Sequence, residues 1–190
     1  FNKYWDVNFG DYVCLTNAAD HEYGKLYSLP FEDNVNGGIP ITFLNVPIEY
    51  LKDAAIKQLK DGESVWFGND VLKEMDRKTG YLDTELYKTD ELFDVDTYMT
   101  KAERLATGEG EVSHAMTLVG VDLDKGEIRK WKVENSWSEK SGRKGYFTMS
   151  DKWFDEFVYE VVVRKEFLTE DQKKLAESKP TPLPAWDSLA

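Results

Sequence analysis

His114 and Asn135 are the two side chains of this sequence whose types and spacing are best suited to acid–base chemistry. His114 stands at the start of one apolar run and Asn135 at the end of a second, and a tight turn separates the two runs. Strands joined in this way pair antiparallel, so their far ends meet. We therefore expect the imidazole and the carboxamide to lie within reach of each other, with the amide orienting a histidine that carries a proton to and from a nucleophile.

A thiol is the nucleophile that a histidine held by an asparagine commonly serves. The amide oxygen accepts a hydrogen bond from one ring nitrogen, which fixes the tautomer and leaves the other nitrogen facing the thiol. Trp137 follows Asn135 closely and is placed to cover that hydrogen bond and exclude water. A single histidine on a strand is usually structural, but the Asn-Ser-Trp triplet at 135–137 and the Gly-Tyr-Phe triplet at 145–147 favour the catalytic interpretation.

Cys14 is the only cysteine, and its surroundings do not suit a nucleophile. Residues 11–16 predict an extended segment with no helix N-terminus and no basic neighbour that would lower the pKa of the thiol. We therefore do not propose Cys14 as a nucleophile and interpret it as a partly buried structural thiol. A single cysteine also excludes an internal disulfide and is typical of a reducing cytoplasm.

The composition predicts a folded chain and limits its partners. The 190 residues, 41% hydrophobic and 32% charged, suffice for one sizeable core with a polar surface. The net charge of −12 opposes binding to nucleic acid. No apolar run approaches the roughly 20 residues that cross a bilayer, and residues 1–6 do not resemble a signal peptide. The acidic residues at 90–96 and 122–124 lack the spacing of a calcium loop, and two histidines with one cysteine argue against a zinc site, so we expect no metal and no cofactor.

Hydrophobic periodicity and turn residues predict a mixture of helices and strands. Residues 1–46 are rich in aromatic residues and broken by glycine and proline, which indicates an irregular surface excursion. The expected helices cover about residues 48–60, 97–105, 151–156 and 169–178, and the expected strands cover 64–68, 112–122, 128–135, 145–149 and 158–165. The proline-containing tail at 179–190 is expected to run extended to its end.

Several of these segments resemble one branch of the papain-like cysteine peptidases, the aminopeptidase C and bleomycin hydrolase family. The resemblance is carried by Val-Trp-Phe-Gly at 65–68, His-Ala-Met-Thr-Leu-Val-Gly-Val-Asp at 114–122, Lys-Trp-Lys-Val-Glu-Asn-Ser-Trp at 130–137, Lys-Gly-Tyr-Phe at 144–147, and Pro-Ala-Trp-Asp at 184–187 with the terminal Ala190. It implies an α+β, papain-like fold in which residues 1–178 form the β-rich, antiparallel-sheet portion with flanking helices.

By this resemblance His114 is the general base and acid, and Asn135 is its orienter. The nucleophilic cysteine and the oxyanion glutamine of the family lie in an upstream helical half with no counterpart in this sequence, so the chain alone is expected to be inactive. The intact enzyme is expected to be a cytoplasmic aminopeptidase that acts on peptides, assembles as a homohexamer and needs no cofactor. Some relatives are reported to bind DNA, but the charge of −12 argues against it here.

One position departs from the family pattern. Ser138 follows Asn-Ser-Trp at the place where the family has glycine. If the glycine serves to adopt a positive φ, serine imposes a strain of about 1 kcal/mol. Alternatively, the backbone has an ordinary conformation there.

The tail at 179–190 has chemistry of its own. By the resemblance it is directed to the active-site cleft, where the terminal carboxylate of Ala190 anchors the α-ammonium of a substrate. Opposite charges in a partly desolvated cleft attract strongly enough to fix the substrate N-terminus, which restricts cleavage to the first residue. The sequence by itself favours a frayed terminus, and it is the resemblance that favours the anchoring role.

A second class of function stays open on sequence alone, a non-catalytic binding or assembly module on the same fold. A reading frame that continues upstream into a glutamine and a Cys-Trp segment would favour the peptidase. A start codon near Phe1 would favour the module.

Overall fold

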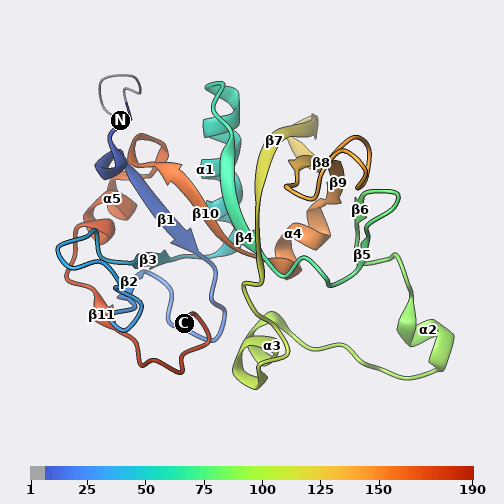
Figure 1. The fold of residues 1–190 in the computed structure, drawn as a ribbon, viewed down its shortest axis with the longest axis horizontal. Coiled ribbons are helices and arrows are strands. Elements are labelled where there is room, and N and C mark those ends of the chain that lie inside the picture. The colour runs from blue at the N-terminus through green and yellow to red at the C-terminus, as the bar shows by residue number, and fades with distance from the viewer. Residues whose placement is uncertain (1–6) are drawn as a thin grey trace.

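The computed structural model describes residues 7–190; residues 1–6, part of the predicted irregular segment, lie outside the described residues. The described strands form one 11-stranded sheet in the order β11-β2-β3-β1-β10-β4-β7-β8-β9-β6-β5 (Figure 1). The strands are β1 (Tyr12–Thr16), β2 (Lys25–Ser28), β3 (Thr42–Asn45), β4 (Val65–Asn69), β5 (Met75–Asp76), β6 (Tyr81–Leu82), β7 (His114–Asp124), β8 (Glu127–Glu134), β9 (Tyr146–Ser150), β10 (Val158–Arg164) and β11 (Thr181–Pro182).

The helices are short apart from the first. They are α1 (Ile48–Lys60), α2 (Thr89–Phe93), α3 (Lys101–Thr107), α4 (Asp151–Phe157) and α5 (Glu170–Ala176), with 3₁₀ turns η1 (Phe9–Asp11) and η2 (Lys165–Phe167). Among residues 7–190, none of the helices combines the length and the hydropathy needed to cross a bilayer.

The centre of the sheet is antiparallel, from β1 through β10, β4, β7 and β8 to β9. Three outer pairs are parallel, namely β1 with β3, β11 with β2, and β6 with β9. The predicted hairpin is present, since β7 and β8 pair from Thr117 opposite Glu134 to Asp124 opposite Glu127. This pairing brings the start of β7 close to the residue that follows β8.

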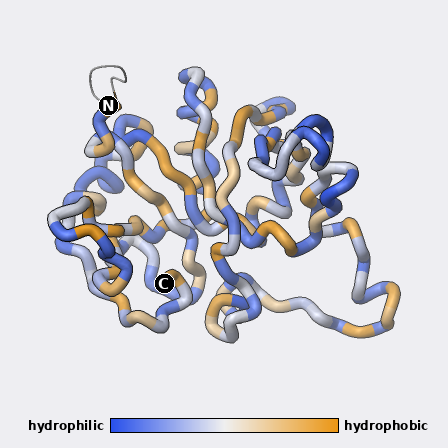
Figure 2. The backbone as a smooth tube through the Cα atoms, viewed as in Figure 1, coloured by the Kyte–Doolittle hydropathy of each residue, from blue (hydrophilic) through white to orange (hydrophobic). Residues whose placement is uncertain are grey.

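Helix α1 packs across the central strands and confirms the predicted helix at 48–60. Its apolar residues recur at helical spacing, so Leu51, Ala54 and Ala55 are buried against the sheet. The core beneath it contains Phe67 of β4 and Leu118 of β7, both fully buried. Figure 2 shows many hydrophobic positions in the central strands, and further ones in the outer segment around α2.

The prediction of an irregular excursion at residues 1–46 is wrong for much of the segment. Strands β1, β2 and β3 all belong to the main sheet, and β1 pairs with β10 over its whole length. The strands are short and their partners are distant in sequence, so local periodicity carried no signal for them. The loop between β2 and β3 does remain irregular and exposed.

The short helix expected at 97–105 begins later, at Lys101. Thr100 is its N-cap, with a capping box to Glu103, and the side-chain and backbone hydrogen bonds of that pair fix the first turn. The helix expected from 169 begins as predicted, with Thr169 as N-cap and Gln172 completing a second capping box.

The C-terminal tail is extended only at its start. Strand β11 pairs with β2, and the Leu183 amide donates to Ser28 O at 2.9 Å. Beyond Pro184 the chain turns, contrary to the expected extended run, because the Asp187 carboxylate accepts from the Leu189 amide and Asp187 O accepts from the Ala190 amide. The turn buries the Leu189 side chain, which is 7% exposed.

Candidate active site

The main chain of His114 is held by strand β4. His114 opens β7 and lies opposite Asn69, the last residue of β4. The fully buried Asn69 donates from Nδ2 to His114 O at 3.1 Å, and its own O accepts from the Ser113 amide. The imidazole therefore projects from a fixed point at the end of two central strands.

The imidazole of His114 is hydrogen-bonded to the amide of Asn135. His114 Nε2 lies 3.0 Å from Asn135 Oδ1. A carbonyl oxygen only accepts, so this contact places the hydrogen of the neutral ring on Nε2 and the lone pair on Nδ1. Nδ1 has no hydrogen-bond partner within residues 7–190. The ring can therefore take up a proton at Nδ1 while Asn135 holds it in place.

Asn135 is itself fixed by the loop that follows it. Its backbone N–H donates to Gly145 O at 3.0 Å. The residue is only 7% exposed. Gly145 has a φ of 87°, which lets the returning chain approach Asn135. Asn135 Nδ2 is buried and has no hydrogen-bond partner among the described residues.

Trp137 covers the imidazole. The two rings are stacked with centroids 5.0 Å apart and planes inclined by 30°. Phe147 of β9 meets the indole edge-on, and the Arg77 guanidinium lies 4.9 Å from the indole centroid. The His114 imidazole and the Arg77 guanidinium thus both pack against the indole, which restricts the ring plane of His114 and covers its bond to Asn135.

The loop at 138–145 is organised by Ser141, which is buried. Its hydroxyl donates to Trp137 O and its amide to Ser138 O, while Arg77 Nε donates to the same hydroxyl. Ser138 adopts a φ of 70°, the left-handed conformation that favours glycine. Ser138 therefore has the positive φ at which a side chain is strained, and not an ordinary backbone conformation.

Replacing Ser138 by glycine is expected to raise the free energy of unfolding by up to about 1 kcal/mol, because glycine adopts this φ without a Cβ clash. The weak bond lost, Lys140 N to Ser138 Oγ at 3.4 Å, offsets little of that. Chemical denaturation of the complete protein measures the change. Ser136→Gly is the matched control, since Ser136 has no positive φ and glycine there should destabilise. Equal effects of the two substitutions would contradict a strained Ser138.

Cys14 lies away from this site. It belongs to β1, and β10 and β4 separate that strand from β7. Burial, and then the charge of Glu160, raise the pKa of the Cys14 thiol well above its usual value. The thiol is therefore protonated at neutral pH and is a poor nucleophile.

The structure brings His114, Asn135 and Trp137 together, whereas Ala190 is exposed and only its neighbour Leu189 belongs to a hydrophobic cluster. Leu189 is buried in a second hydrophobic cluster, and Val112, just before His114, packs against that same cluster.

Sequence reasoning missed Asn69 and Arg77. The Asn-Asp pair that ends the apolar strand β4 is a signal that could have pointed to Asn69, whereas Arg77 carried none. No group of metal-ligating side chains occurs within residues 7–190.

A histidine oriented by an asparagine, capped by a tryptophan and mounted at the end of an antiparallel sheet defines the histidine-bearing portion of a papain-like fold. A family model described as the Peptidase C1-like family matches residues 1–190. The chain belongs to this family, and the predicted α+β, papain-like fold is confirmed.

The curated relatives of the chain include aminopeptidases of lactic acid bacteria. It is 70% identical to aminopeptidase G of Lactobacillus delbrueckii subsp. lactis and 45% identical to aminopeptidase C of Lactobacillus helveticus, in both cases over 100% of its own length. A solved structure, PepW of Lactobacillus rhamnosis, superimposes with a TM-score of 0.96 at 52% identity. The chain spans 44% of aminopeptidase G, 43% of aminopeptidase C and 44% of the PepW chain.

Proposed function

We propose that this chain is the C-terminal part of a cytoplasmic cysteine aminopeptidase that releases N-terminal residues from peptides. The observation that carries the proposal is the hydrogen bond from His114 Nε2 to Asn135 Oδ1 beneath Trp137, which presents Nδ1 as a proton acceptor. The names of the relatives support the aminopeptidase class.

The mechanism follows from the two ring nitrogens. Nδ1 of His114 takes the proton of a cysteine thiol supplied by the upstream half, and the thiolate attacks the first peptide carbonyl. The imidazolium then gives that proton to the departing amine, which leaves an acyl-enzyme. In the second step Nδ1 takes a proton from water, the hydroxide displaces the thiolate, and the thiolate recovers the proton. Throughout, Asn135 Oδ1 accepts from Nε2 and prevents the ring from turning away.

Two features of the chain support the proposal that other segments pack against it in the complete protein. Asn135 Nδ2 is a buried donor without a partner among the described residues, and such a group costs about 1–3 kcal/mol unless something pairs with it. Around α2, Leu92 is 72% exposed and Tyr98 67% exposed. Exposed apolar side chains of this kind mark interfaces, and we assign these to the homohexamer that the family resemblance implies.

We further propose that Ala190 anchors the substrate N-terminus through its carboxylate. The support is the turn that ends the tail and the shared packing of Leu189 and Val112 in one cluster, which ties the chain end to the segment leading into His114. A carboxylate held beside the cleft attracts an α-ammonium and repels the carboxyl end of a peptide.

The test compares the complete protein with the 190-residue chain on an aminoacyl fluorogenic substrate. The complete protein is expected to hydrolyse it, with activity abolished by a thiol alkylator, whereas the chain alone gives no turnover because its single thiol is a partly buried structural one with a raised pKa. Turnover by the chain alone would contradict the proposal. A complete protein without turnover on any aminoacyl substrate would indicate the non-catalytic module instead.

A further inference from the structure

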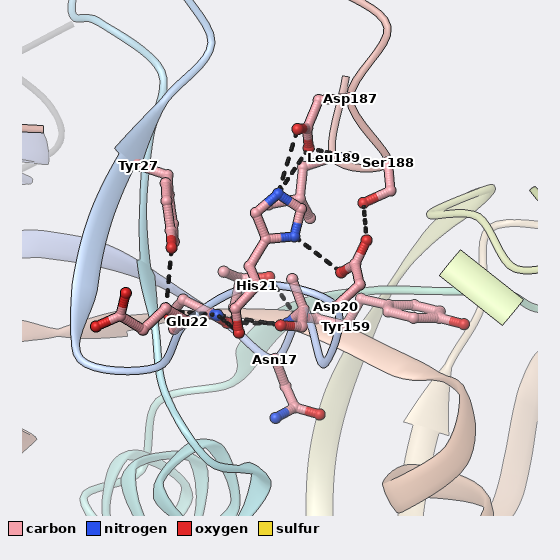
Figure 3. Close-up of polar contacts among 12 residues, drawn as sticks. Asn17, Asp20, His21, Glu22, Tyr27, Tyr159, Asp187, Ser188 and Leu189 are labelled. Carbon is pink, nitrogen blue, oxygen red and sulfur yellow. Dashed lines mark hydrogen bonds and ion pairs between the residues drawn. The ribbon is translucent and has the colours of Figure 1, made fainter. Parts of the chain in front are cut away.

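The second histidine of the chain ties the C-terminal arm (residues 181–190) to the loop at 17–24. Figure 3 shows the His21 imidazole between two carboxylates. His21 Nδ1 lies 2.8 Å from Asp20 Oδ1, and His21 Nε2 lies 3.2 Å from the carboxylate of Asp187 on the arm. The other oxygen of Asp20 accepts from Ser188 Oγ at 2.7 Å. These contacts join two segments that are more than 160 residues apart, since the His21–Asp187 separation is 166.

The protonation state of His21 decides whether both contacts exist as hydrogen bonds. Ionised carboxylates only accept, and a neutral imidazole has one N–H to donate. Facing a carboxylate with each nitrogen, His21 donates to both only as the imidazolium. Its side chain is 15% exposed and those of Asp20 and Asp187 are 14% and 11% exposed, so solvent screens these charge-assisted bonds weakly.

Both segments joined by His21 are otherwise ordered. The loop at 17–24 is fastened by the fully buried Asn45, whose side chain accepts from the Ala18 amide and donates to the carbonyls of Ala18, His21 and Glu22. On the arm, β11 pairs with β2 and Leu189 is buried. The arm between these two points has few other polar contacts to the body, so His21 and Asp20 determine where its last turn lies.

The two carboxylates beside His21 favour its protonated form, whereas burial opposes it. Burial lowers the pKa of His21, but the hydrogen bonds and charges of Asp20 and Asp187 outweigh it, so the pKa is raised above its ordinary value. From β2 the Tyr27 ring meets the imidazole edge-on at 5.3 Å, and its hydroxyl donates to Glu22 O. The Glu22 carboxylate is paired with Lys25 and does not face His21.

We propose that His21 is a positioning residue which, in its protonated form, latches the C-terminal arm between Asp20 and Asp187 and thereby sets the place of the terminal carboxylate. The consequence for catalysis rests on the function proposed for Ala190, which carries that carboxylate three positions after Asp187.

The sign of the pH dependence follows from the raised pKa. The latch contributes fully below the pKa of an unfolded histidine, about 6.5, and is lost as the pH rises through the higher folded value. At alkaline pH the imidazole keeps one N–H, one carboxylate loses its donor, and the last turn of the arm is held less tightly.

Digestion of the complete protein by a carboxypeptidase tests the latch without reference to activity. Release of Ala190 and Leu189 is measured by mass spectrometry between about pH 5.5 and 9 and normalised to a free peptide of residues 179–190. In the wild type, release is expected to be about ten-fold slower at the acidic end, the size of one charge-assisted hydrogen bond. His21→Gln and Asp187→Asn should release quickly at every pH, and Glu22→Gln, the matched control, should follow the wild type.

Wild-type release without pH dependence, or variants that follow the wild type, would overturn the latch. Should His21→Gln disturb the loop, Asp187→Asn provides the same test from the arm alone, since Asp187 is the arm partner of His21. In activity assays His21→Gln should raise KM for aminoacyl substrates about ten-fold at pH 6 and leave kcat within about two-fold. If removing the arm leaves KM unchanged, the role of Ala190 fails; if arm removal raises KM but His21→Gln does not, the latch fails.

Discussion

Replacing His114 by glutamine is expected to lower kcat of the complete enzyme at least about 10⁴-fold, because the ring nitrogen that takes the proton of the thiol disappears. Glutamine keeps a polar side chain at this half-buried position, so folding should be little affected. The Asn135 amide and the Trp137 ring remain, but neither takes up a proton at neutral pH. Single-turnover kinetics on an aminoacyl substrate separate this loss in the chemical step from any change in binding.

Cys14→Ala is the matched control for this experiment. It removes the only thiol of the chain, and since that thiol lies partly buried on β1 with a raised pKa, kcat should stay within about two-fold of the wild type. A His114→Gln enzyme that keeps more than about a tenth of the wild-type kcat would contradict the role of His114. A large loss of kcat in Cys14→Ala would instead indicate that Cys14 is the nucleophile.

Removing Ala190 from the complete enzyme is expected to lower kcat/KM for aminoacyl substrates about 100-fold. The terminal carboxylate then belongs to Leu189 and lies about 3.5 Å further back along the chain. Attraction between opposite charges a few ångströms apart weakens rapidly when they are separated and rehydrated. The loss should be mainly in KM, and peptides blocked at the N-terminus should become cleavable because the shortened chain end no longer occupies the place of the blocking group.

Ala190→Gly is the control for the truncation, since it keeps the carboxylate at its place and removes only a methyl group. Its kcat/KM should remain near the wild-type value, and blocked peptides should stay resistant. Equal kinetics of the truncated and full-length enzymes would show that the carboxylate of Ala190 does not bind the substrate. An Ala190→Gly enzyme as impaired as the truncated one would show that the methyl group matters instead.

The sequence by itself determined the elements whose pattern is local. Helix α1 follows from apolar residues at helical spacing, and the hairpin of β7 and β8 follows from two apolar runs and the turn at Lys125-Gly126. That hairpin brings the start of β7 close to the residues that follow β8, and His114 and Asn135 lie just beyond its last paired residues, Thr117 and Glu134. The motif containing Asn135 and Trp137 likewise lies within one short segment, so the family could be identified before any coordinates.

Only the tertiary structure decided the contacts that join distant segments. Strands β1 to β3 entered the sheet through partners far along the chain, Arg77 reached Trp137 from another loop, and Asp187 reached His21 across 166 residues. No pattern of residue spacing encodes such contacts, since they depend on how the whole sheet twists and which loops its edges bring together. The sequence predicted the chemical groups of the site, but it did not predict the residues that hold these groups or position the chain end.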